Sequence, residues 1–379
     1  MWLVKYTFGH IEISDRARSL VEESFQRNWV SAGQSTKKFE ELFASTFSYK
    51  HAVAVSSGTS ACFAALAALH EYGATWGDEV IVPALSFVAT ANAVLAAGFK
   101  PVFVDIKRDT LNIDPQKIEA AITQKTRAIL LVHTMGKPCD MEIICQIKDK
   151  HGLFLLEDCC EAHGAKYKGG VVGSFGFAGM FSFYAAHIVC SGEGGMVVTQ
   201  DDQFVKLLRS VRSHGRPDGT DYFQFDRFGL NCKMNDLEAA VGIAGIENFQ
   251  SIFDRRKKNL GYLLKQNQDL SHLLYLLEEA PHEIISPHAF SLVIRENIPV
   301  DQHHLSNYLQ EAGVQVKTLF GSLPTQHRVF KFLGYREGDF REAEYVGKKG
   351  LHFGCHQYLT QKELDYVTEH LHTYFKKYL

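Results

Sequence analysis

The chain has 379 residues, and its 40 Lys and Arg against 43 Asp and Glu give a formal net charge of −3. Nucleic-acid backbones are held by clustered excess cations, so this balance excludes a dedicated nucleic-acid-binding protein. With 46% hydrophobic and 22% charged residues, the composition is that of a globular chain, and the length allows two domains.

No apolar run approaches the roughly 20 residues that cross a bilayer, and the first residues lack the basic-then-apolar layout of a signal peptide. The eight cysteines show no Cys-x-x-Cys pair and no regular spacing, which is typical of free thiols in a reducing compartment. We therefore expect a cytoplasmic protein with no membrane partner, no nucleic-acid partner and no bound metal.

Short apolar runs alternate with helical segments over the first two-thirds of the chain. The runs are almost continuously apolar, as expected of strands that are covered on both faces. The predicted strands are 51–55, 79–83, 101–105, 128–133, 154–158, 179–183 and 195–199, and the clearest predicted helices are 60–72, 87–97, 115–123, 141–151 and 202–213. This alternation predicts an α/β fold with a parallel or mixed central sheet between layers of helices.

The pattern changes near residue 245. A charged segment, 247–266, predicts a connecting helix, and its run of four cations at 255–258 predicts a solvated face, with a nucleic-acid patch as the alternative. Beyond it, 289–294 and 314–319 could pair in a smaller sheet, and 361–379 predicts a closing helix. We divide the chain into a large domain, 1–250, and a small C-terminal α+β domain, 251–379.

A turn of small residues follows the first predicted strand. Ser56, Ser57, Gly58, Thr59 and Ser60 lead directly into an Ala-rich helix. The free N–H groups and positive dipole end of a helix, together with such hydroxyls, can form a phosphate site. A plain N-cap is the alternative. The turn is not a Walker loop, and the glycine-rich stretches 170–173 and 192–195 lack the context of a dinucleotide-binding fingerprint.

Two further residues stand where predicted strands end. Phe87, at a strand-to-helix junction, could lie against a planar cofactor ring, with a core aromatic as the alternative. Asp158 ends a very apolar strand, at the sheet edge where ligands of α/β proteins bind. There a carboxylate can keep a pyridinium N–H protonated, and an N-cap for the next segment is the alternative.

These pieces occur in an order that resembles nucleotide-sugar aminotransferases of the DegT/StrS family. The resemblance extends over nearly the whole chain, through the segments 56–59, 82–92, 156–165, 181–184, 192–199, 212–216 and 229–234. It implies the aspartate aminotransferase fold (fold type I), the cofactor pyridoxal 5′-phosphate (PLP) with its pyridoxamine form (PMP), and a homodimer with shared active sites.

Residue by residue, the resemblance implies the following cofactor contacts. Gly58, Thr59 and Ser182 match positions that hold the phosphate, Phe87 matches the stacking aromatic, and Asp158 matches the partner of the pyridine nitrogen. Glu161 matches a polar residue near the hydroxyl edge of the ring, and Asn231 matches one that reaches the phosphate from the other subunit. Lys233 stands where an Arg is often found, which leaves the role of that cation open.

The chain departs from the family at His187. Family aminotransferases carry the lysine that bonds covalently to the cofactor at this position, and an imidazole cannot replace that amine. A histidine can still move protons near neutral pH. The same substitution marks the PLP-dependent sugar 3-dehydratases, with GDP-4-keto-6-deoxymannose 3-dehydratases as the nearest branch, and segments 319–326 and 353–357 also resemble that branch.

The branch implies dehydration at C3 of a nucleotide-linked 4-keto-6-deoxyhexose, favoured as GDP-linked, in deoxysugar biosynthesis for lipopolysaccharide O-antigen. L-Glutamate would supply the amino group, ammonia would be released, and His187 would be the acid and base. The close Cys-x-Cys of the dehydratases that use an iron–sulfur cluster is absent, so no cluster is expected. The alternatives are a sugar 4-aminotransferase with a tolerated or engineered His187, or a silent PLP-binding homologue. Family position makes His214 and His356 candidate substrate contacts, against the alternative of ordinary surface histidines.

Overall fold

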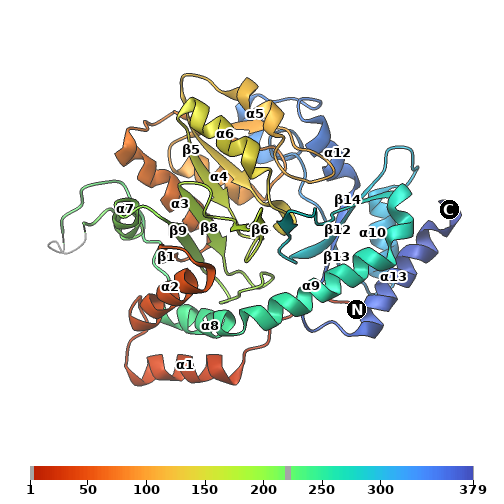
Figure 1. The fold of residues 1–379 in the computed structure, drawn as a ribbon, viewed down its shortest axis with the longest axis horizontal. Coiled ribbons are helices and arrows are strands. Elements are labelled where there is room, and N and C mark those ends of the chain that lie inside the picture. The colour runs from red at the N-terminus through yellow and green to blue at the C-terminus, as the bar shows by residue number, and fades with distance from the viewer. Residues whose placement is uncertain (1–3, 218–222, 379) are drawn as a thin grey trace.

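The computed structural model describes residues 4–217 and 223–378, with a seven-stranded sheet at its centre (Figure 1). In spatial order its strands are β1 (His51–Val55), β9 (Gly195–Thr199), β8 (Ala178–Ser182), β5 (Phe154–Asp158), β4 (Thr126–Val132), β2 (Glu79–Pro83) and β3 (Lys100–Val104). The five strands from β8 to β3 run parallel, whereas β9 is antiparallel to both β8 and β1. The sheet is therefore mixed, and the predicted α/β class is confirmed.

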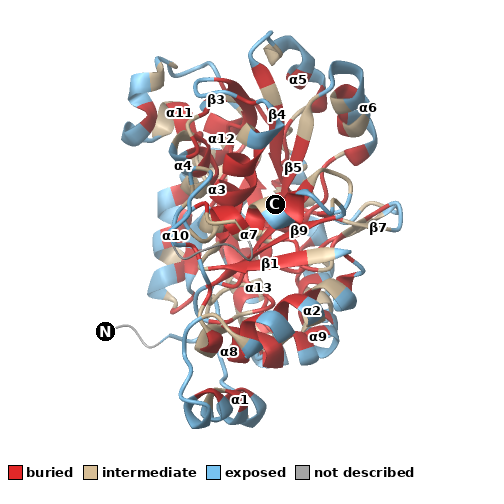
Figure 2. Cartoon of the chain, turned by 90° about the vertical axis from the view of Figure 1, so that its left-hand side faces the viewer, coloured by how far each residue is buried: buried red, intermediate tan, exposed pale blue. Residues whose placement is uncertain are grey.

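Alternate residues of the strands point to different helical layers. On β1, Val53 and Val55 pack against α3 (Gly58–Ala68), α4 (Val88–Ala96) and α7 (Phe204–Val211). Ala52 and Ala54 face the opposite layer, where α2 (Gln34–Phe47) and α8 (Asp236–Glu247) cover β1, β9 and β8. Farther along that face, α5 (Pro115–Ala121) and α6 (Met141–His151) cover the remaining strands. Burial on both faces explains why the strands are apolar throughout (Figure 2).

A second, four-stranded sheet lies in the C-terminal part. Its order is β10 (Leu274–Leu276), β12 (Ala289–Ile294), β14 (Gly350–Gly354) and β13 (Val316–Thr318), all antiparallel. The segments expected to pair with each other, 289–294 and 314–319, share this sheet, but β14 lies between them. The sequence reading missed β14 because glycines bound it and α12 (Arg341–Lys349) runs directly into it.

The remaining elements connect these sheets. They are α1 (Asp15–Gln26), α9 (Phe249–Gln266), α10 (Gln302–Glu311), α11 (Leu323–Gln326), α13 (Gln361–Phe375) and the small sheet of β11 (Glu283–Ile284), β6 (Lys166–Tyr167) and β7 (Gly170–Val171). Helix α9 crosses the lower face of the molecule without a break, as predicted for a connecting helix (Figure 1). Tyr6 packs into the hydrophobic cluster formed otherwise by residues from 260 onward. The domain boundary at 250/251 stays a prediction.

Three predictions concern the closing helix, the cysteines and membrane-spanning segments. The closing helix is confirmed as α13 followed by a short 3-10 turn at 376–378, while Leu379 and the first three residues lie outside the described residues. All eight cysteines are unpaired. Within the described ranges, no helix has the length and apolar character needed to cross a membrane.

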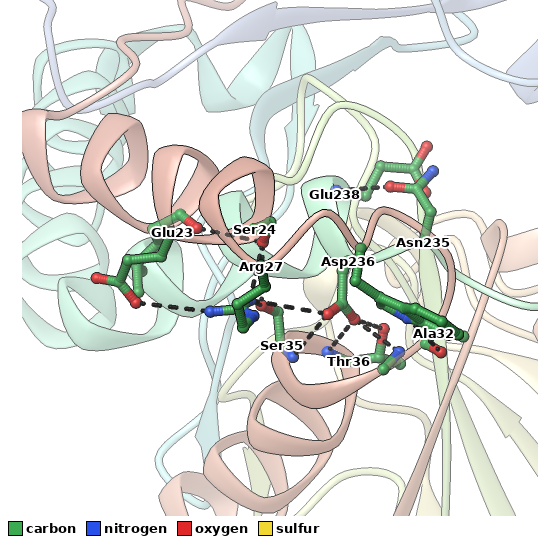
Figure 3. Close-up of polar contacts among 12 residues, drawn as sticks. Glu23, Ser24, Arg27, Ala32, Ser35, Thr36, Asn235, Asp236 and Glu238 are labelled. Atoms are coloured by element: carbon green, nitrogen blue, oxygen red, sulfur yellow. Dashed lines mark hydrogen bonds and ion pairs between the residues drawn. The ribbon is translucent and has the colours of Figure 1, made fainter.

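A buried carboxylate, Asp236 at the start of α8, anchors α8 to the start of α2 (Figure 3). Its Oδ1 accepts hydrogen bonds from the N–H of Gly33 at 2.8 Å and from the N–H and hydroxyl of Thr36 at 2.9 and 2.7 Å. Its Oδ2 accepts from the N–H of Ser35 at 3.1 Å and lies 3.9 Å from Arg27. These contacts satisfy N–H groups at the start of α2, and they fix the start of α2 against the start of α8.

Candidate active site

The small-residue turn after β1 forms the N-terminus of α3. Ser57 is extended and its hydroxyl accepts the N–H of Ser60 at 3.1 Å, so the residue is a helix N-cap. The hydroxyls of Ser56 and Ser57 each lie 3.0 Å from that of Ser60. The N-cap and the phosphate-site interpretations are compatible, because the cap leaves the first N–H groups of α3, from Gly58 and Thr59, pointing away from the helix.

Gly58 is packed too closely for any side chain. A Cβ added there would lie 2.6 Å from Cβ of Ser182 and 2.9 Å from Sγ of Cys160. Ser182 ends β8 and is buried. The structure thus brings together Gly58, Thr59 and Ser182, as the resemblance implied, at the ends of β1 and β8.

Asp158 lies at the end of β5 with only 7% of its surface exposed. Its Oδ2 accepts from the hydroxyl of Thr90 on α4 at 3.3 Å and from the thiol of Cys62 on α3 at 3.8 Å. Its Oδ1 accepts the N–H of Cys160 at 3.1 Å, so Asp158 caps the turn that follows β5, although no helix starts there. Hydroxyl and thiol donors from two helices hold this carboxylate at the ligand edge of the sheet.

Phe87 precedes α4 and is 59% exposed, so the core-aromatic alternative is wrong. Its ring lies 6.1 Å from that of Phe320 and lines a cavity of about 750 Å³. Other residues from α10, α12 and the segment 318–327 line the same cavity. An exposed aromatic face suits stacking of a planar ring. Asp158 and Ser182 do not line this cavity, and His187 lines a separate one.

His187 lies in the turn after β8 and is half-buried. Its Nδ1 lies 2.8 Å from the carbonyl oxygen of Ser182. A carbonyl only accepts hydrogen bonds, so Nδ1 carries the proton and Nε2 of the neutral ring keeps its lone pair. Burial is the main cause that lowers the pKa of His187 to about 4, and the charge of Arg256 adds to it, against the bond to Ser182. The ring is therefore a neutral base at pH 7.

Arg256 corrects one prediction. The cationic run of α9 was expected to be a solvated face, and Arg255 and Lys258 are exposed as predicted. Arg256 is instead buried, with its guanidinium 2.9 Å from the side-chain oxygen of Gln357 and 3.5 Å from the carbonyl of Ala186. It shares a helix face with the buried Phe253 and Leu260, at spacings of three and four residues. That periodicity could have identified it, because it places Arg256 on the apolar stripe.

Glu161 lies just past β5, with its side chain 13% exposed. Its Oε2 accepts the N–H of Met135 at 2.6 Å, and its Oε1 lies 3.4 Å from Nε2 of His288. Burial, with a smaller contribution from the Asp158 carboxylate, raises the pKa of Glu161 to about 7, against the Met135 hydrogen bond. Sequence reasoning missed His288, because nothing in its local sequence indicates that it reaches Glu161.

One group of possible metal ligands occurs in the described residues, namely His133, Glu157 and Cys159. Nε2 of His133 lies 3.1 Å from Glu157, and Nδ1 of His133 accepts the N–H of Cys139 at 3.0 Å. Backbone N–H groups in the loop 173–176 donate to both oxygens of Glu157. These bonds already occupy the imidazole and the carboxylate, so the group ties the loop before β8 to β5.

Asn231 and His214 lie on exposed turns near the end of α7. Nζ of Lys233 donates to the side-chain oxygen of Asn231 at 2.7 Å, and the carbonyl of Cys232 accepts the N–H of Ser56 at 2.8 Å. Burial, followed by the guanidinium groups of Arg216 and Arg212, lowers the pKa of Lys233. The segment therefore borders the small-residue turn of its own chain, and the contact of Asn231 with a partner's phosphate stays a prediction. So does a substrate contact of His214.

His356 follows β14 and is 3% exposed, so it is not a surface histidine. Its Nε2 lies 2.8 Å from the hydroxyl of Thr7, and its ring stacks on that of His10. Burial, followed by the charges of Arg256 and His10, lowers the pKa of His356 to about 4. A substrate contact stays a prediction, and the observed role is to hold the N-terminal segment.

The residues present fit PLP. Gly58 and Thr59 begin α3, and the N–H groups at the start of a helix suit a phosphate. Asp158 suits a protonated pyridine nitrogen, and the face of Phe87 is free to stack on a ring. Lysine is absent at 187, and the residue there is a neutral imidazole.

The chain matches the DegT/DnrJ/EryC1/StrS aminotransferase family over residues 12–372. Among its relatives, GDP-perosamine synthase of Caulobacter vibrioides is 33% identical, with 92% of this chain and 93% of the relative aligned. GDP-4-keto-6-deoxy-D-mannose 3-dehydratase of Yersinia pseudotuberculosis is 32% identical, with 94% and 95% aligned. A solved E. coli GDP-4-keto-6-deoxy-D-mannose-3-dehydratase with bound hydrated PLP is 30% identical, covers 97% of this chain and 100% of its own, and has a TM-score of 0.90. Identity alone does not distinguish the two activities.

Proposed function

Because the chain belongs to the DegT/DnrJ/EryC1/StrS aminotransferase family, we propose that it is a PLP-dependent sugar 3-dehydratase, acting in the cytoplasm as a homodimer. Its substrate would be a nucleotide-linked 4-keto-6-deoxyhexose, favoured as GDP-linked, and L-glutamate its co-substrate. The observation that carries the proposal is His187, a neutral imidazole with a free Nε2 where family aminotransferases hold their lysine.

The overall reaction balances without an external reductant. Glutamate becomes 2-oxoglutarate and ammonia, and its two electrons replace the C3 hydroxyl of the sugar by hydrogen. When bound, PLP would serve as the electron sink for proton removal, and Asp158 would keep its ring nitrogen protonated. Gly58, Thr59 and Ser182 would hold its phosphate, and Phe87 would stack on its ring.

His187 performs the proton transfers in this proposal. Its Nδ1–H is fixed by the Ser182 carbonyl, which directs Nε2 as the proton acceptor. A low pKa leaves the base unprotonated at neutral pH, and once charged the imidazolium readily gives the proton back. The same group can therefore take a proton at one step and return it to the departing hydroxyl at another. A lysine here would instead displace the sugar from the cofactor, which would give an aminosugar.

A second candidate is a sugar 4-aminotransferase, which the 33% identity to a GDP-perosamine synthase favours. The third is a homologue that binds PLP without turnover. His187 speaks against the aminotransferase, because an imidazole cannot form the covalent link that this activity uses.

The products of one incubation distinguish the three. The protein is supplied with PLP, L-glutamate and a GDP-4-keto-6-deoxyhexose, and the sugar is analysed by mass spectrometry while ammonia is assayed. We expect a 3-deoxy sugar and one ammonia per sugar. An aminosugar without ammonia would support the aminotransferase and overturn the proposal, and no change in the presence of bound PLP would support the silent homologue.

A further inference from the structure

Two segments that are far apart in sequence meet at the carboxyl group of Glu161, one through a backbone N–H and the other through the side chain of His288. The first is the turn after β4, where Met135 has a φ of 54° and donates its N–H to Oε2. A non-glycine residue in this left-handed region is strained, which is typical of functional positions. The second is the segment before β12, where the N–H of Ser286 donates to the carbonyl of Gly136 at 3.0 Å. That bond ties the segment carrying His288 to the Met135 turn.

His288 is placed by this arrangement between Glu161 and His187. Its Nε2 lies 3.4 Å from Oε1 of Glu161, and its ring lies 5.4 Å from that of His187 at a steep angle of 61°. His288 is buried and Glu161 is partly buried, with side chains 6% and 13% exposed. Nδ1 of His288 has no hydrogen-bond partner within the described part of the chain.

We propose that His288 is a positioning residue of this site: it holds Oε1 of Glu161, shares one proton with that carboxyl group, and so keeps a proton donor and acceptor beside His187. The inference rests on the proposed function only for placing Glu161 at the hydroxyl edge of the cofactor ring. Neither the reaction nor the resemblance calls for a histidine at 288.

The sharing follows from the hydrogen-bonding capacity of the two groups. When Glu161 is ionised, a neutral His288 donates Nε2–H to it. When Glu161 is protonated, its O–H donates to Nε2 and the imidazole proton sits on Nδ1. Either state keeps one hydrogen bond between the two side chains, so the pair can take up or release one proton without losing that contact.

The surrounding charges favour this neutral exchange over an ion pair. Burial first, then electrostatic interactions with His187, Arg256, His352 and His163, lower the pKa of His288 well below its usual value. The pKa of Glu161 is raised to about 7, by burial and by Asp158. A buried cation on His288 is therefore disfavoured, whereas a proton on Glu161 is accessible near neutral pH.

The test is a pH titration of the absorbance of bound PLP, without sugar, from about pH 5.5 to 9. We expect a spectral transition that Glu161→Gln abolishes. In His288→Leu the carboxylate loses a donor, so the midpoint should rise by about one pH unit. In His288→Asn an amide N–H can replace the imidazole, so the midpoint should rise by less than half as much. The matched control is His151→Asn, which removes an exposed histidine 2.9 Å from Glu119 and should move nothing.

A second readout uses the protein without cofactor. In ¹⁵N-histidine NMR spectra, Glu161→Gln should shift the ring nitrogens of His288, identified by their loss in His288→Asn, and leave those of His151 unchanged. This readout also serves if His288→Leu fails to fold.

Three results would overturn the proposal: no transition sensitive to Glu161, equal shifts in His288→Leu and His288→Asn, or unmoved ring nitrogens of His288. Because no sugar is used, an aminosugar product would refute the dehydratase and leave the role of His288 standing.

Discussion

Removal of the Asp236 carboxylate should weaken the whole N-terminal layer of the protein. Asp236 is fully buried and accepts four hydrogen bonds from Gly33, Ser35 and Thr36. In Asp236→Asn the amide oxygen can keep the three bonds to Oδ1, but the NH₂ group then faces the N–H of Ser35 and the Arg27 guanidinium, which are both donors. One hydrogen bond to a charged group is lost and a repulsive contact replaces it, so we expect a loss of about 2–3 kcal/mol.

Asp236→Ala removes every bond and leaves the start of α2 without partners, so we expect a loss of about 3–5 kcal/mol. Urea unfolding, monitored by circular dichroism, gives both free-energy losses from the shift of the unfolding midpoint, provided that the dependence of the unfolding free energy on urea concentration has the same slope. The matched control is Asp254→Asn, an exposed aspartate on α9 bonded to Gln250, which should stay within about 0.5 kcal/mol of the native chain. An Asp236→Asn protein as stable as the control would refute the reasoning, as would equal losses in Asp236→Asn and Asp236→Ala.

Further predictions concern the cofactor site and pH. Gly58→Ala forces a Cβ to within 2.6 Å of Ser182, so we expect PLP affinity, measured by fluorescence titration, to fall about tenfold or more, while Gly261→Ala, with open space around it, leaves it unchanged. An unchanged affinity in Gly58→Ala would contradict the phosphate site. Arg256→Met removes a cation that lowers the pKa of His187, so the acid limb of the pH–rate profile should move to higher pH; a shift to lower pH would contradict that electrostatic role. Stability should fall as pH drops from about 6.5 towards 4, because the unfolded chain then binds more protons at histidines whose folded pKa is lowered to about 3 or 4. These are His187, His352 and His356. Glu161 has a raised pKa and therefore adds stability as the pH falls from about 7 to 4.5, but it is a single group against three histidines. A urea midpoint that rises on acidification would contradict this prediction.

The sequence was sufficient for the large sheet and the main site positions. Runs such as 51–55 and 154–158 are apolar throughout because both faces are covered, and their bounds agree with β1 and β5. The turn at Gly58 and the acid at Asp158 were identified from their places at strand ends. Those signals are local in the sequence, so they can be recognised without knowledge of the tertiary structure.

What the sequence could not provide depends on packing between distant segments. β14 carries no strand pattern, and it is a strand because β12 and β13 enclose it. Arg256 is buried because its helix, α9, lies against the turn that carries His187, where the guanidinium approaches the carbonyl of Ala186. The approach of His288 to Glu161 depends on the Met135 turn, whose left-handed residue no composition rule predicts.

The most direct test of the central claim, that His187 replaces a covalent link, is the intact mass of the PLP-loaded protein after borohydride reduction. We expect an unchanged polypeptide mass for the native chain and a gain of one reduced cofactor for His187→Lys, which regains a primary amine. A cofactor bonded to the native chain by reduction would contradict it.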